Sequence, residues 1–188
     1  SEGMTFSFES PKVFDKLRLD ADDPLRQAIT IANPQGEDYS IMKTTPLNGM
    51  LVSLARNFNR RNKDVKLYEM AKIYLPKSLP LTDYADERVQ FTLGFYGEGD
   101  FFTMKGVVEE FLERAGMHDI VDYDPNAGKN FLHPGRQANI IYQGKVIGYM
   151  GEVHPEVCEN YDMKTRAYIA VLDMPFITEM ATFDRHFK

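Results

Sequence analysis

The sequence predicts one α+β domain, built on a largely antiparallel sheet that helices flank. Strand candidates follow one another directly in the chain, and helix candidates are interspersed at irregular intervals. Strict alternation of strands and helices would instead indicate a doubly wound parallel sheet. The chain of 188 residues is 43% apolar, which is enough to bury a core of its own.

The first elements lie before residue 44. Residues 4–8 alternate apolar and small polar side chains, which is typical of a half-buried strand. Ser10 and Pro11 suit the cap and first position of a short helix that runs to residue 17. A polar loop then leads to a short strand at residues 38–43.

The middle of the chain predicts a helix and two strands. Thr45 and Pro46 open a helix whose apolar side chains recur at helical spacing, a pattern that indicates core packing. Residues 65–75 alternate along a long strand that has two usable faces, and Pro76 ends it. After a polar loop, residues 88–96 form the next strand.

The second half opens with Gly97 and Gly99, which break the chain before a helix that Thr103 is expected to cap. Gln143 and Gly144 predict a tight hairpin between two strands. The remaining strands are expected at residues 119–123, 137–142, 145–153 and 166–174, with a short helix from residue 154 to about residue 161.

Charge is unevenly spread along the chain. The net charge of −6 argues against a surface that is basic throughout, as a dedicated nucleic-acid binder would have. Residues 43–77 nevertheless hold eight cations and two anions. Cations at the end of a helix favour its dipole, but they also suit RNA phosphates or an acidic partner. The candidates for such contacts are Arg56, Arg60, Arg61 and Lys63.

Signatures of self-contained catalysis are missing from the sequence. The four histidines show no helical i, i+4 pair, and the single Cys158 permits no intrachain disulfide or cysteine-based metal site, so no metal is expected. Cys158 is expected to be a small buried hydrophobe. The glycines near Gly97 lack the order of a dinucleotide or phosphate-binding loop. No apolar run approaches the roughly 20 residues of a membrane span, so no membrane is expected as a partner and a cytoplasmic protein is expected.

Five stretches, in order along the chain, resemble the beta subunit of bacterial phenylalanyl-tRNA synthetase. They are residues 33–47, residues 55–74, MKGVVE at 104–109, HPGR at 133–136 and GEVHPEV at 151–157. The resemblance is nearly full-length. It implies a class II aminoacyl-tRNA synthetase-like fold in a copy that has lost its active site, while the alpha subunit carries the chemistry.

The resemblance also implies which phosphate-binding groups are missing. Class II enzymes hold ATP phosphates with arginines of their motifs 2 and 3, and the planar guanidinium suits phosphate. Here the motif 2 arginine position falls on Leu75, and the motif 3 pattern falls on Val171, Asp173 and Phe176. A carboxylate at Asp173 would repel nucleotide. No catalytic residue and no cofactor are therefore expected in this chain, with ATP and Mg²⁺ bound by the alpha subunit.

Domain limits and an interface follow from the same resemblance. Residues 1–180 are expected to form the non-catalytic class II synthetase-like domain, and residues 181–188 to begin the link to a C-terminal anticodon-binding domain outside this chain. The strand at residues 4–8 corresponds to motif 1, which builds class II interfaces, so Met4, Phe6 and Phe8 are candidate contacts with the alpha subunit. Their period-2 pattern predicts equally well that they face the domain's own core.

Two classes of function fit these observations. The first is a structural and interface domain of an alpha-beta heterotetramer that attaches phenylalanine to its tRNA. The alternative is a stand-alone nucleotide-binding enzyme on the same fold. A tRNA-binding module is a further possibility, which depends on the basic stretch alone.

Overall fold

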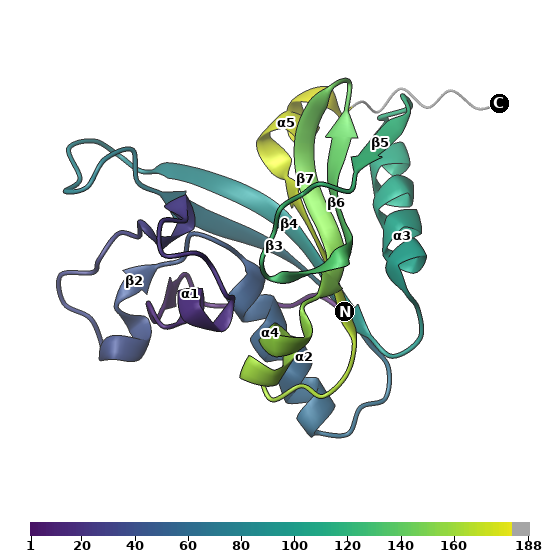
Figure 1. Cartoon of the computed structure of the whole chain (residues 1–188). Coiled ribbons are helices and arrows are strands. Elements are labelled where there is room, and N and C mark those ends of the chain that lie inside the picture. Colours follow the sequence, from purple (N-terminus) through teal and green to yellow (C-terminus); the bar gives the residue numbers. More distant parts are fainter. Residues whose placement is uncertain (182–188) are drawn as a thin grey trace.

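A computed structural model describes residues 1–181 of the chain (Figure 1). The predicted link at residues 181–188 therefore lies almost wholly outside the described residues. The elements are, in order, β1 (Phe8–Glu9), α1 (Val13–Lys16), the 3₁₀ helices η1 (Pro24–Arg26) and η2 (Glu37–Tyr39), β2 (Ile41–Met42), α2 (Leu47–Asn59), β3 (Val65–Leu75), β4 (Asp86–Tyr96), α3 (Phe101–Arg114), β5 (Val121–Asp124), β6 (Leu132–Tyr142), β7 (Lys145–Val153), α4 (Pro155–Asn160), β8 (Ala167–Asp173) and α5 (Met174–Met180).

The main sheet has six strands in the order β3-β4-β8-β7-β6-β5, and every neighbouring pair is antiparallel. The predicted α+β class with a largely antiparallel sheet is confirmed. Strand β8, which comes last in the sequence, lies between β4 and β7 at the centre of the sheet. A central strand of the sheet is therefore formed by the last strand in the sequence.

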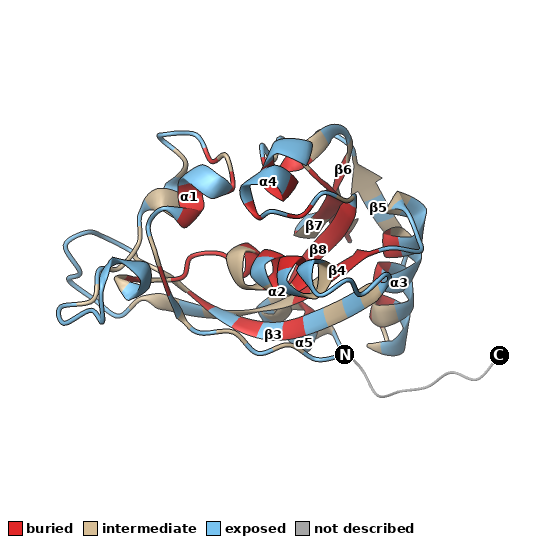
Figure 2. Cartoon of the chain, turned by 90° about the horizontal axis from the view of Figure 1, so that it is seen from below, coloured by how far each residue is buried: buried red, intermediate tan, exposed pale blue. Residues whose placement is uncertain are grey.

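The two faces of the sheet are covered by different helices. We call the side of α1, α2 and α4 the front face, because their buried side chains share one hydrophobic cluster with alternate residues of β8. We call the side of α3 and α5 the back face, where a second cluster holds the other alternate residues of β8. Buried residues in Figure 2 follow the central strands β7 and β8.

Two helices begin at other residues than the sequence predicts. Helix α3 starts at Phe101 rather than after Thr103, because Asp100 is its cap. Asp100 Oδ1 accepts from the Thr103 amide at 2.9 Å, and Thr103 Oγ1 accepts from the Asp100 amide at 3.1 Å. This reciprocal capping box satisfies two amides, so Thr103 is the third helical residue and not the cap. Helix α1 begins at Val13, later than Ser10 and Pro11 suggested.

Several strand bounds differ from prediction by one or two residues, and three strands depart further. The alternating segment 4–8 pairs regularly only at β1, and the segment 38–43 pairs only at β2, because these two short strands form a separate two-stranded sheet. Strand β6 begins at Leu132 rather than residue 137, and its register with β7 is irregular between Leu132 and Gln137. Helix α5, which directly follows β8, was not predicted.

None of the helices within residues 1–181 combines the length and the apolar character that a membrane crossing requires.

Candidate functional site

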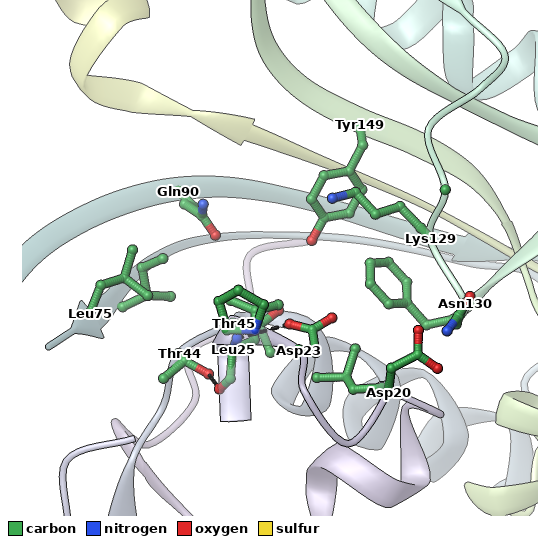
Figure 3. Close-up of a pocket in the computed structure, with 15 residues that line it drawn as sticks. Asp20, Asp23, Leu25, Thr44, Thr45, Leu75, Gln90, Lys129, Asn130 and Tyr149 are labelled. Carbon is green, nitrogen blue, oxygen red and sulfur yellow. Dashed lines mark hydrogen bonds between the residues drawn. The ribbon is translucent and has the colours of Figure 1, made fainter. Parts of the chain in front are cut away.

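A cavity of about 350 Å³ opens on the front face of the sheet, between the sheet and the N-terminal segments (Figure 3). Strands β3 and β4 supply Ile73, Leu75 and Gln90, and β7 supplies Tyr149. Residues 128–131 form another wall. Four residues of the loops before α2 complete the polar lining: Asp20, Asp23, Thr44 and Thr45.

The polar groups of the cavity are largely engaged with the protein itself. Asp23 Oδ1 accepts from the Leu25 amide at 2.8 Å, and Thr44 Oγ1 donates to the Leu25 carbonyl at 2.6 Å. The Lys129 ammonium lies 5.1 Å from the centre of the Tyr149 ring, a cation–π contact. Burial raises the pKa of the Tyr149 hydroxyl, so this group stays protonated at neutral pH. Among residues 1–181, the lining of the cavity thus holds two carboxylates, one ammonium and no guanidinium.

The four positions at which phosphate-binding groups were expected to be missing do not all lie around one site. Leu75 lines the cavity with an aliphatic side chain. Val171 is fully buried in the front-face core, whereas Phe176 belongs to the back-face cluster, with Lys145 Nζ 4.2 Å from its ring centre. Asp173 pairs in register with Gln90, so its side chain lies on the front face beside the cavity.

The charge of Asp173 is partly balanced, which sequence reasoning did not foresee. Arg88 Nη1 lies 3.0 Å from Asp173 Oδ2, and Arg88 Nη2 lies 2.8 Å from Asp86 Oδ2. One guanidinium therefore serves two carboxylates, which leaves one net negative charge beside the cavity. Arg88 is occupied by these carboxylates and does not face the cavity as a phosphate ligand would.

The N-terminal segment presents its apolar side chains outward. Met4, Phe6 and Phe8 are 93%, 76% and 46% exposed. The alternate residue Glu9 is buried, and Thr5 is half-buried. The interpretation that Met4, Phe6 and Phe8 face the domain's own core is therefore wrong. Phe6 and Phe8 line a groove of about 530 Å³ together with Ile31, Asn33, Pro34, Gln35 and Tyr39.

A buried polar network holds the inward side of this segment against the body of the domain. Glu69 Oε1 accepts from the Thr5 amide and hydroxyl, each at 2.8 Å, and Lys43 Nζ donates to Thr5 Oγ1 at 3.2 Å. Lys43 Nζ lies 3.9 Å from Glu69 Oε1, and both side chains are almost fully buried. Glu9 Oε2 accepts from Asn48 Nδ2 at 3.2 Å. We call Thr5, Glu9, Lys43, Asn48 and Glu69 the anchoring network.

Burial and neighbouring charges shift the pKa values of Glu9 and Lys43 in the anchoring network in opposite directions. Glu9 Oε1 is buried and meets no hydrogen-bond donor within residues 1–181. Burial raises the pKa of Glu9 from 4.5 to about 7, against the opposing effects of the hydrogen bond from Asn48 and the charge of Lys43. Burial also lowers the pKa of Lys43, although both glutamates oppose that shift. Sequence reasoning missed this network, but Glu69 was a signal, since it is the one charged residue on an otherwise apolar face of β3.

The basic candidates lie together where α2 ends and β3 begins. Arg56, Arg60, Arg61 and Lys63 are all exposed, and none has a carboxylate within 4 Å among the described residues. Arg61 takes a positive φ of 64°, which turns the chain out of the helix. The group does not border the front-face cavity.

Residues 1–181 offer little for metal binding or for a reactive thiol. No three histidine, cysteine or carboxylate side chains of this part of the chain are grouped as metal ligands would be. Cys158 is buried in α4, and burial raises the pKa of its thiol to about 11. The prediction that Cys158 is a small buried hydrophobe is confirmed.

The strand order, with a long hairpin of β3 and β4 beside the last strand, defines the fold of a class II aminoacyl-tRNA synthetase. Pyrrolysyl-tRNA synthetase from Desulfitobacterium hafniense has this fold, with a TM-score of 0.75 over 95% of this chain and 62% of that chain, at 10% identity. A second structure of a pyrrolysyl-tRNA synthetase from this organism gives a TM-score of 0.72 over 96% and 60% of the two chains, at 12% identity. At such identities the likeness is one of fold alone.

Sequence comparison defines the family within this class. The family model described as "Phenylalanyl tRNA synthetase beta chain CLM domain" matches residues 1–174, and the chain belongs to this family. The phenylalanine–tRNA ligase beta subunit of Clostridium acetobutylicum is 41% identical over 188 residues, which cover all of this chain and 24% of that protein. The beta subunit of Syntrophus aciditrophicus is 38% identical over 194 residues, covering 96% and 24%. The chain thus spans about a quarter of the length of these relatives.

Proposed function

We propose that this chain is a non-catalytic structural and interface domain of a phenylalanine–tRNA ligase. It pairs with a catalytic alpha subunit inside an alpha-beta heterotetramer and supports the attachment of phenylalanine to its tRNA, which takes place in the cytoplasm. The relatives are beta subunits of phenylalanine–tRNA ligases, which supports this assignment. Because the chain spans only about a quarter of their length, the activity and the partners of the ligase are part of the proposal.

The observation that carries the interface role is the inverted burial of residues 4–9. An ordinary half-buried strand packs its apolar side chains on the core and leaves its polar ones in water. Here Thr5 and Glu9 turn inward and Met4, Phe6 and Phe8 turn outward. Aromatic and methionine side chains are enriched at the cores of interfaces, and an exposed apolar row of this kind favours association.

The anchoring network supports the same role because it fixes the segment before a partner arrives. Glu69 holds both the amide and the hydroxyl of Thr5, and the Lys43 amide donates to the Ser7 carbonyl at 2.9 Å. A preorganised surface loses less conformational entropy on binding. We therefore assign Met4, Phe6 and Phe8 to contact with the alpha subunit.

The lack of a catalytic role is supported by the front-face cavity. ATP carries several negative charges, and class II enzymes meet them with guanidinium groups. Of the described residues, the lining of this cavity offers Leu75 and one cation, Lys129, with Asp20 and Asp23 in its wall. We propose that ATP and Mg²⁺ bind to the alpha subunit and that this domain holds no cofactor.

The interface is tested by substituting Phe6→Ser and Phe8→Ser together in the complete beta subunit, co-expressed with the alpha subunit. We expect co-purification of the alpha subunit to fall at least tenfold, while the melting temperature of the beta subunit stays within about 2 °C, since exposed substitutions change stability little. Val52→Ser and Val146→Ser are matched controls, because both valines are exposed elsewhere. Wild-type co-purification together with earlier melting would show that the segment serves the fold and not the partner.

The absence of catalysis has its own test. Calorimetry with ATP and phenylalanine-dependent pyrophosphate exchange, both performed on the beta subunit without the alpha subunit, should give no signal above a blank. Exchange by the beta subunit alone, lost on substitution of Lys129→Gln, would favour the stand-alone nucleotide-binding enzyme.

A further inference from the structure

Most lysine and arginine side chains within residues 1–181 contact a carboxylate or an aromatic ring of the domain. The remaining ones lie in two stretches of the sequence. Within residues 1–181, six lysine and arginine side chains have neither a carboxylate within 4 Å nor an aromatic ring beneath them. They are Arg56, Arg60, Arg61, Lys63, Lys66 and Lys164. All six are exposed. Five of them come from one stretch of sequence, whereas Lys164 comes from a loop about a hundred residues later.

The sheet brings these two stretches to the same end of the domain. Val65 pairs with Tyr96, and Tyr96 pairs with Ala167, so the first residues of β3 and β8 lie in one row. Two strand spacings separate them, roughly 10 Å. The chain just before each strand carries Lys63 on one side and Arg166 on the other.

Contacts between the loops agree with this arrangement. Tyr96 Oη donates to the Asn62 carbonyl at 2.8 Å, which fixes the chain between α2 and β3 to the end of β4. The C-terminal end of α2 and the loop from α4 to β8 both lie at the lower end of Figure 1. We call Arg56, Arg60, Arg61, Lys63, Lys164 and Arg166 the cationic rim.

One side of the cationic rim borders a pocket of about 480 Å³, which Arg136, Lys164 and Arg166 line together with Glu152. Arg136 donates hydrogen bonds from Nε and Nη2 to the buried Glu152 carboxylate. Arg166 Nε lies 3.8 Å from Glu152 Oε1 and its side chain is 75% exposed. Arg136 balances Glu152, and Glu159 also lines this pocket, so Arg166 and Lys164 together leave one net positive charge at its mouth.

Acids also lie near the cationic rim: Asp64, Glu98 and Asp100 on the side of Lys63, and the exposed Glu159 and Asp162 on the side of Lys164. Asp64 Oδ1 accepts from the Glu98 amide at 3.3 Å, and Asp100 caps α3. The carboxylate of Glu98 is exposed and has no cation within 4 Å among the described residues. Glu98 therefore weakens the positive potential on the side of Lys63, as Glu159 and Asp162 do on the side of Lys164.

We propose that the cationic rim binds the phosphate backbone of RNA. Lysine and arginine that are free of internal partners can neutralise phosphates without breaking an ion pair, and each such contact releases counterions. Residues 56–66 and 163–167 contain no exposed large apolar side chain, which a protein interface core would require. The one aromatic residue of these two ranges, Phe58, is half-buried and packs edge-on against the Tyr96 ring, so no exposed ring is offered for base stacking. The surface therefore positions RNA through its backbone and reads no sequence.

This inference rests on the proposed function, because the RNA that would bind the cationic rim is the tRNA of the proposed ligase. The test uses the complete beta subunit assembled with the alpha subunit and a phenylalanine tRNA transcript, titrated between 50 and 300 mM salt. Two double variants remove opposite sides of the rim: Arg60→Gln with Lys63→Gln, and Lys164→Gln with Arg166→Gln. The matched control is Lys72→Gln with Lys77→Gln, which removes two exposed cations that pair with Glu87 and Asp83 elsewhere.

Each rim variant should weaken tRNA binding about tenfold and lower the slope of log K against log salt by about 2, because two phosphate contacts are lost. The control should change affinity less than about twofold. Glu98→Gln should strengthen binding by about twofold to threefold, since it removes a repulsion near the phosphates. A duplex RNA of unrelated sequence should show the same losses.

Unchanged affinity and salt slope in both rim variants would overturn the proposal, and so would an equal loss in the control. If the rim variants instead lose the alpha subunit while tRNA affinity per assembled enzyme is preserved, the surface serves an acidic protein partner. Failure of the wild-type beta subunit to assemble with the alpha subunit would overturn the proposed function. The titration repeated on the beta subunit alone would then still decide on RNA binding.

Discussion

Strand β8 and the N-terminal segment 4–9 are both period-2 elements, yet they follow opposite rules of burial. Along β8 both faces are covered, and its residues from Ala167 to Leu172 are buried in the two clusters of the core. The N-terminal segment turns polar groups toward the domain and apolar groups toward water. The first element is explained by the fold of this chain alone.

This difference in burial is the observation on which the proposed interface role of the segment depends. Exposed apolar residues scattered singly need no explanation, but an alternating row whose polar side chains are the buried ones does. The anchoring network supplies the attachment that the hydrophobic effect supplies elsewhere in the domain. Stability should therefore depend on the inward residues of the segment, and association on its outward residues.

The largest effect is expected from Ile169→Ala in β8. The side chain is fully buried at the centre of the sheet, so its truncation should lower the free energy of unfolding by about 4 kcal/mol. Phe6→Ala removes a larger side chain but should change it by less than about 0.5 kcal/mol, because Phe6 is exposed. Urea denaturation of both variants checks the comparison, and similar losses would place Phe6 in a core after all.

Lys43→Ala tests whether the segment is held by the anchoring network. The substitution leaves the buried Glu69 and Glu9 without their cation, which should cost about 3 kcal/mol of unfolding free energy. Lys12→Ala is the matched control, since Lys12 pairs with Glu37 at the surface and should cost less than about 0.5 kcal/mol. Faster amide exchange at Thr5 in the first variant alone would tie the loss to this segment, and equal costs would contradict the anchoring role.

The pH dependence of stability should reveal Glu9. Its pKa is raised on folding from 4.5 to about 7, so its contribution to stability is fully present below pH 4.5 and is lost as the pH rises through 7. This change corresponds to about 3 kcal/mol. Glu9→Gln should match the wild-type chain in unfolding free energy near pH 4 and exceed it at pH 8. Parallel stability curves for the two proteins from pH 4 to 8 would show that Glu9 does not titrate in this range.

The smallest effect is expected from Leu75→Arg, which restores the residue type that motif 2 of class II enzymes carries. Leu75 lies at the half-exposed end of β3, so stability should change by less than about 0.5 kcal/mol. Pyrophosphate exchange should remain absent, because Asp20 and Asp23 still border the cavity and the Asp173 carboxylate still lies beside it. Exchange activity in this single variant would mean that the loss of the arginine alone had silenced the site.

Much of the fold was predictable because local patterns and tertiary packing agree. The alternation at residues 65–75 and the strand expected at residues 145–153 match β3 and β7 at their observed bounds. Gln143 and Gly144 both take positive φ, as a tight hairpin requires. The candidate site was less predictable, since Gln90 and Tyr149 come to one cavity from different strands whose order in the sheet does not follow the sequence.

The sequence by itself determined the α+β class, most strands, the helix of residues 47–59 and the synthetase family. Side-chain period and family motifs are local properties of the chain, so they can be read without coordinates. Only the tertiary structure decided that Met4, Phe6 and Phe8 point outward, since a period of two defines two faces and does not say which one is covered. Only the tertiary structure also showed that Lys63 lies at the same end of the domain as Lys164 and Arg166, because strand order sets which distant segments share one end of a sheet.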